Sequence, residues 1–216
     1  MNDEEIAHLL DAGQKISIEI LKAGDPLFPA WRGTDTGPWD ASEIDPAAGQ
    51  VSRVDLGGLL IPADSTDEIR LVRSAGSIVA ATVVRGPTGL QLQACRSDGS
   101  RTWEAVRGEL RQTMRSRGAV VEEWAGDAGP ELRALLPVTT AAGNADTQRV
   151  RMLGCDGPGW LLRGIIVSGA GAASESRSVW VYDKFLQAVV VSSVSGRAMR
   201  SIIARWMKAS DGGAAW

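Results

Sequence analysis

Three carboxylates stand close together in the segment TGPWDASEID, residues 36–45. Asp40 and Glu43 lie three residues apart, and Asp45 follows. Paired carboxylates serve as general acid and base in catalysis, and carboxylate oxygens are also ligands of hard divalent cations. The same spacing fits a capping box, in which Asp40 begins a short helical turn and Glu43 reaches back to its backbone. We favour the capping box and keep a carboxylate- or metal-dependent hydrolase or transferase as an alternative function.

Trp39 stands between the Gly37–Pro38 turn and this expected helical turn. A tryptophan held in a defined position is a typical anchor, because its ring buries a large apolar area. It docks either on the body of the protein or on a partner. We therefore place Trp39, Asp40 and Glu43 among the predicted partner-binding residues.

The other residue types that carry out catalysis are scarce in this chain. His8 is its one histidine, and the two cysteines, Cys95 and Cys155, lie in strand-like surroundings typical of buried thiols. Zinc requires clustered cysteine and histidine side chains. Glu122 and Glu123 are neighbours on an expected strand, so they point to opposite faces and form no pair. We predict no catalytic residue, no metal site and no cofactor.

A weak nucleotide-binding pattern occurs in GIIVSGAGAAS, residues 164–174. Gly169 and Gly171 match the start of a dinucleotide fingerprint, but Ser174 stands where the third small residue belongs, and the next strand lacks the acidic residue that binds ribose. A phosphate-binding loop of the G-x-x-x-x-G-K-[ST] type is missing. We interpret the segment as a flexible connection.

Residues 195–208 (SGRAMRSIIARWMK) predict a basic amphipathic helix. Such a helix binds a partner groove, lies on an anionic membrane or packs on its own sheet. We favour a partner protein or self-association, and consider a membrane surface the weaker alternative. The predicted contact residues are the apolar Met199, Ile202, Ile203 and Trp206 and the basic Arg197 and Arg200.

Charge is unevenly distributed along the 216 residues. Residues 1–48 contain ten acidic and three basic residues, for a net charge of −7, whereas the remainder has a net charge of +4. Nucleic-acid binding favours a larger basic excess, so we do not expect it. Neither a secretory signal nor an apolar run of membrane-spanning length is evident. The expected location is the cytoplasm.

Alternating apolar residues and short Gly/Pro turns predict strands along most of residues 51–193. A helix is expected at about 103–116 with Thr102 as its cap. A second is expected at about 176–187, with Val179, Tyr182, Phe185 and Leu186 facing inward. Trp103, Val106, Leu110 and Met114 share one face of the first helix, and Arg107, Arg111 and Arg115 form a stripe elsewhere on its surface.

This order of elements predicts an α+β fold with a mainly antiparallel sheet and packed helices. Four segments are expected: an N-terminal helix/strand extension at 1–22, an acidic Gly/Pro-rich arm at 23–50, the α+β body at 51–193, and the basic C-terminal helix with its tail at 194–216.

Several blocks occur in the order of a known family: GPWDASEID, VDLGGLLIP, LQLQA, WEAVRGEL, GPELRALLPV and DGPGWLLRG. With them, residues 36–193 resemble the uncharacterised domain of unknown function 3710 of high-GC Gram-positive bacteria. The resemblance implies a cytoplasmic protein without an assigned activity, and carries over no catalytic residue. The family's usual Pro-rich tail is replaced here by the basic helix. The element order is also similar to Mog1/PsbP-like and secretion-chaperone-like sandwiches.

These observations favour a non-enzymatic cytoplasmic protein-binding module, an adaptor or a chaperone-like protein. The acidic arm with Trp39 and the C-terminal helix with Trp206 would be its contact elements.

Overall fold

The computed structural model describes residues 37–45, 51–74, 77–99, 102–126, 128–139, 143–168 and 179–191. The N-terminal extension and the predicted C-terminal helix lie outside these residues. The described strands are β1 (Trp39–Asp40), β2 (Arg53–Asp55), β3 (Leu59–Pro62), β4 (Glu68–Ser74), β5 (Ser77–Arg85), β6 (Thr88–Arg96), β7 (Val120–Gly126), β8 (Gly129–Thr139), β9 (Ala145–Gly157), β10 (Trp160–Ser168) and β11 (Val189–Val190). The described helices are α2 (Trp103–Ser116) and α3 (Val179–Leu186).

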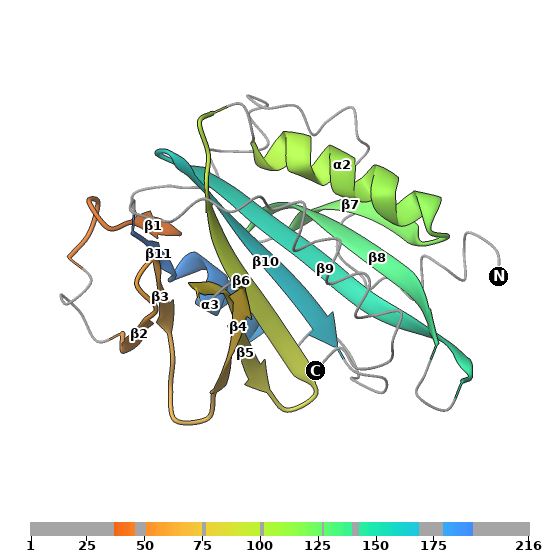
Figure 1. The fold of residues 1–216 in the computed structure, drawn as a ribbon, viewed down its shortest axis with the longest axis horizontal. Coiled ribbons are helices and arrows are strands. Elements are labelled where there is room, and N and C mark those ends of the chain that lie inside the picture. The colour runs from red at the N-terminus through yellow and green to blue at the C-terminus, as the bar shows by residue number, and fades with distance from the viewer. Residues whose placement is uncertain are drawn as a thin grey trace.

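The strands form two sheets (Figure 1). The larger has seven strands in the order β4-β5-β6-β10-β9-β8-β7, and every neighbouring pair is antiparallel. The smaller has the order β1-β11-β3-β2, and only its β1–β11 pair is parallel. The predicted mainly antiparallel sheet with packed helices is therefore confirmed.

The central strand β10 separates two apolar cores, because successive side chains of a strand point to opposite faces. Leu161 and Ile165 pack in the core beneath α2, whereas Leu162 and Ile166 pack in the core that contains α3 and strands of the small sheet. Almost the whole strand is buried, and this explains its continuous apolar sequence. Figure 1 shows α2 lying along β7, β8 and β9, with α3 beside the small sheet.

Helix α2 begins and ends where the sequence predicts. The Thr102 hydroxyl accepts the Ala105 N–H at 3.3 Å, and the Asp156 carboxylate from β9 also accepts the Trp103 N–H. Trp103, Val106, Leu110 and Met114 are all buried against the large sheet, as expected.

The arginine stripe of α2 differs from the sequence prediction. Arg107 is buried rather than on the surface, with its Nε 3.5 Å from Glu123 Oε2. Arg111 also contacts this glutamate, since its Nη1 donates to Oε1 at 2.6 Å. Two arginines one helical turn apart thus neutralise a single buried carboxylate of β7. A buried charge is stable only when it is paired in this way, and the helical period alone does not reveal its partner.

Helix α3 places Tyr182 and Phe185 in the core as predicted, whereas Leu186 is only half-buried. Val181 is fully buried although the sequence analysis did not select it. Within the described residues, no helix combines the length and apolar content needed to cross a membrane.

Candidate binding cleft

The segment around Trp39 joins the small sheet. The Trp39 N–H donates to Ala188 O at 3.0 Å, and β1 pairs in parallel with β11 through Trp39–Val189 and Asp40–Val190. Part of the expected arm therefore docks on the body, one of the two alternatives for Trp39. Its indole is half-buried, so its role in partner binding stays a prediction.

The predicted capping box is present. The Asp40 N–H donates to Glu43 Oε2 at 2.7 Å, and Asp40 Oδ1 accepts the Ser42 N–H at 2.9 Å. Asp40 is buried, and its Oδ2 accepts the indole N–H of Trp160 at 2.8 Å. These bonds fasten the turn to the central strand β10. Partner contact by Asp40 and Glu43 stays a prediction.

Asp40, Glu43 and Asp45 do not come together as a set of three metal ligands, and the alternative of a carboxylate- or metal-dependent hydrolase or transferase stays a prediction. Asp40, Glu43 and Asp45 are all described, yet no group of three or more Asp, Glu, His and Cys side chains in the described residues is arranged to hold a metal ion. Cys95 and Cys155 are buried thiols that form no disulfide within the described residues, as expected. Glu122 and Glu123 point to opposite faces of β7, as expected. The predicted contact residues Arg197, Met199, Arg200, Ile202, Ile203 and Trp206 lie outside the described residues, and so does His8.

An open cleft of about 700 Å³ lies where the small sheet, the β3–β4 loop and α3 meet. Val51 and Pro62 supply apolar surface on one side, and Trp180 supplies it from α3. Asp64, Ser65, Arg85, Asp183, Lys184 and Gln187 supply most of the polar surface. This volume is within the range of pockets that bind small molecules or a few side chains of a peptide.

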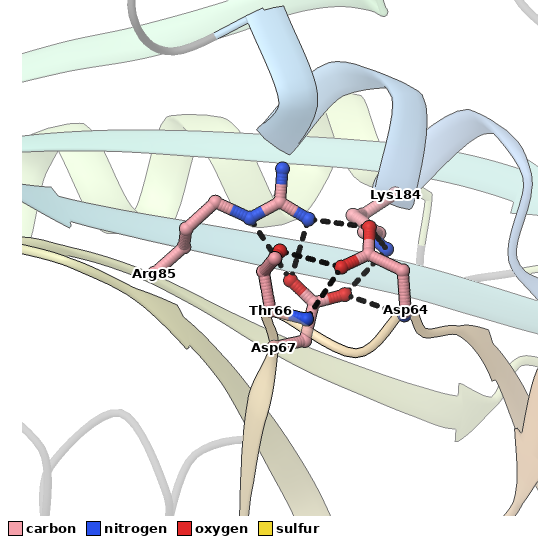
Figure 2. Close-up of polar contacts among 5 residues, drawn as sticks. All are labelled: Asp64, Thr66, Asp67, Arg85 and Lys184. Carbon is pink, nitrogen blue, oxygen red and sulfur yellow. Dashed lines mark hydrogen bonds and ion pairs between the residues drawn. The ribbon is translucent and has the colours of Figure 1, made fainter.

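Two cations and two carboxylates form a network at this cleft (Figure 2). Asp67 lies in the β3–β4 loop, and its side chain is fully buried. Lys184 Nζ of α3 donates to its Oδ2 at 2.6 Å, and Arg85 Nη2 of β5 donates to its Oδ1 at 2.7 Å. The network therefore connects the loop, the large sheet and α3.

Asp64 is the exposed member of the network, with 53% of its side chain accessible. Its Oδ2 accepts Arg85 Nη2 at 2.6 Å and lies 3.4 Å from Lys184 Nζ, while the hydroxyl and N–H of Thr66 donate to its Oδ1. The Arg85 guanidinium also lies over the Trp180 ring, 5.0 Å from its centroid. The charged network thus contacts the apolar surface that Trp180 supplies to the cleft.

The network keeps both carboxylates ionised. The Thr66 hydroxyl and N–H, followed by Lys184 and Arg85, hold the pKa of Asp64 well below its usual range. Burial alone would raise the pKa of Asp67, but hydrogen bonds from Lys184, the Asp64 N–H and Arg85 lower it below its usual value. A general acid or base works best with a pKa near the working pH. These groups are therefore suited to holding structure or ligand rather than to moving protons.

The sequence analysis did not select this site. Asp64 and Asp67 lie in the run DSTDE, which is typical of a polar turn, and Arg85 and Lys184 are more than 90 residues apart in sequence. One signal was present: a lysine stands between Tyr182 and Phe185, on the buried part of a short helix. Such a lysine requires a carboxylate partner.

Comparison with protein families gives a match over residues 37–205 to a family described as a protein of unknown function (DUF3710). A comparison with curated proteins finds no match. The family match extends past residue 193, where the sequence resemblance was expected to end, and includes Arg197, Met199, Arg200, Ile202 and Ile203 of the predicted C-terminal helix. That segment is thus part of the family pattern and not a feature of this chain alone. Since the match covers most of the chain, the protein belongs to the DUF3710 family.

Proposed function

We propose that the protein is a non-enzymatic cytoplasmic protein-binding module, an adaptor or a chaperone-like protein, and that it takes a segment of its partner into the cleft beside α3. The observation that carries this proposal is the composition of the cleft. Exposed Val51 and half-buried Trp180 offer apolar contacts, and the carboxylates of Asp64 and Asp183 offer hydrogen-bond acceptors. Apolar surface with a few polar groups beside it is typical of protein interfaces and of ligand pockets.

The charged network supports binding because it makes the cleft rigid. Asp67, Arg85 and Lys184 are joined by hydrogen bonds of 2.6–3.1 Å that connect three separate elements. A preorganised site loses less entropy when its ligand binds than a mobile one does. The ionised state of Asp64 and Asp67 argues in the same direction, since it provides no group poised for proton transfer at neutral pH.

The scaffold is also consistent with this role. The likeness in element order to Mog1/PsbP-like and secretion-chaperone-like sandwiches is part of the proposal, as an analogy at the level of the fold, and it does not identify a partner.

Site-specific photo-crosslinking in cells tests the proposal. A photoreactive phenylalanine analogue replaces Ser65, an exposed residue that lines the cleft. The control carries it at Glu109, an exposed residue of α2. We expect a crosslinked protein from the Ser65 variant that is absent from the Glu109 variant, and mass spectrometry then identifies the bound segment. Equal crosslinking at both positions, or none at Ser65, would contradict the proposal.

A further inference from the structure

Strand β4 is the outermost strand at one side of the large sheet. Among the described strands it pairs only with β5, from Glu68–Val84 to Ser74–Ser77. Within the described residues, its other edge therefore presents backbone donors and acceptors to which another strand can pair. Leu71, at the centre of β4, is 40% exposed, the highest value for a large hydrophobic side chain in the described residues.

The first four residues of this edge, Glu68–Leu71, carry little of the protection that usually prevents strand pairing. Proteins block exposed edges with proline, lysine, bulges or unpaired charges, and β4 contains neither proline nor lysine. Arg70 is neutralised along the strand, since its Nε and Nη2 donate to the carboxylate of Glu68 at 2.8 and 3.1 Å. The register irregularity falls between Val72 and Arg73, and Arg73 is exposed, so these two protections lie at the C-terminal end of the strand.

The sequence of β4 suits pairing with a second copy of itself in one antiparallel register. Pairing centred on Arg70 would place two arginines directly opposite each other, which is destabilising. Pairing centred on Leu71 places the two exposed leucines opposite each other and Arg70 opposite Val72. In that register no two like charges face each other, and the exposed apolar surface of both copies becomes buried.

We propose that two copies of the chain associate through their β4 strands, paired antiparallel about Leu71, so that the seven-stranded sheet continues from one copy into the other. The interface is isologous, because a two-fold axis relates the two β4 strands. It lies on an edge strand of the large sheet and uses none of the residues that line the cleft. The proposal therefore stands independently of the proposed function.

Sedimentation velocity of the full chain over a range of concentrations tests the association. Leu71→Lys introduces a charge opposite its own copy, and should weaken dimerisation at least tenfold. The matched control is Val54→Lys, on the outermost strand of the small sheet, since Val54 is similarly exposed at 38%. It should leave the dimer unchanged. A wild-type chain that stays monomeric at all concentrations overturns the proposal, and so does a dimer that Leu71→Lys does not weaken.

Cysteine crosslinking tests the register without relying on a destabilising variant. Residues directly opposite in antiparallel strands have Cβ atoms about 4.5–5.5 Å apart, close to disulfide distance. Leu71→Cys should thus form a disulfide-linked dimer on mild oxidation, whereas Val54→Cys should not. A mixture of Arg70→Cys and Val72→Cys chains should link more efficiently than either alone. The two native cysteines are buried and do not compete. Linkage through Leu71→Cys that is no faster than through Val54→Cys overturns the register.

Discussion

At the scale of single residues, Asp67 is the group on which the charged network depends. Its side chain is fully buried, and both cations of the cleft donate to it. A buried carboxylate without such partners is costly, so Lys184 and Arg85 are needed to keep it charged. The exposed Glu68–Arg70 pair, whose side chains are 62% and 45% accessible, has no comparable role in stability.

Replacing Asp67 with the neutral asparagine should change how the free energy of unfolding depends on pH. Its pKa in the folded protein lies below the usual value of 3.8. The folded state thus holds this proton less tightly than the unfolded state, and the stability it contributes is present above about pH 4 and lost as the pH falls through the lowered pKa. In Asp67→Asn the fall in unfolding free energy between pH 5 and pH 3 should be smaller than in the wild type. Urea denaturation at each pH, followed by tryptophan fluorescence, measures the free energy of unfolding.

Asp183→Asn is the matched control, because the Asp183 carboxylate lines the same cleft but forms no hydrogen bond or ion pair with the described part of the chain. It should keep the acid dependence of the wild type. If the free energy of unfolding fell by the same amount between pH 5 and pH 3 in Asp67→Asn and in the wild type, the network would not stabilise the folded state through Asp67.

At the scale of elements, the position of α2 on the sheet depends on a glycine of β9. A Cβ at Gly154 would overlap the indole ring of Trp103, the first residue of α2. Trp103 also donates its indole N–H to Pro130 O at 2.6 Å, so the ring is fixed at both its edge and its face. Gly154 thus leaves space for the indole ring of Trp103 and allows α2 to lie close to β9.

A pair of Gly→Ala substitutions tests this packing. Gly154→Ala should destabilise the protein by about 1–3 kcal/mol, the usual cost of overfilling a core. Gly108→Ala lies within α2 with no atom near its new Cβ, and should stabilise it by about 0.5–1 kcal/mol through helix propensity. Urea midpoints of both variants give the comparison. If Gly154→Ala were as stable as the wild type, Trp103 would have to be free to move.

Helices and strands with strong periodicity could be predicted from the sequence. The residues that they contact in the folded protein could not. The bounds of α2, the capping box at Asp40 and the strand at residues 160–168 follow from local patterns. The burial of Arg107 and the network of Asp67 with Lys184 depend on residues far apart in sequence. Local spacing has no information on such contacts, and this is why the cleft was missed.

At the scale of the whole molecule, the described residues contain one of the two expected contact elements, the Trp39 segment. The Trp39 segment is part of the small sheet, held by β11 and by the bond from Trp160 to Asp40. The predicted basic helix at 195–208 lies outside the described residues, so its role as a contact element stays a prediction. The family match runs through residue 205 and therefore includes most of this segment.

Substitution of Trp206 tests the predicted helix directly. If the stripe of Met199, Ile202, Ile203 and Trp206 binds a partner, Trp206→Ala should remove most of the protein recovered with the intact chain from native lysate, because aromatic anchors dominate such interfaces. Trp216→Ala, which truncates another tryptophan of the same tail, should recover the partner as the wild type does. Undiminished recovery by Trp206→Ala would rule out this anchor. Salt-sensitive pelleting of the wild type with anionic vesicles, in place of protein recovery, would favour the membrane alternative.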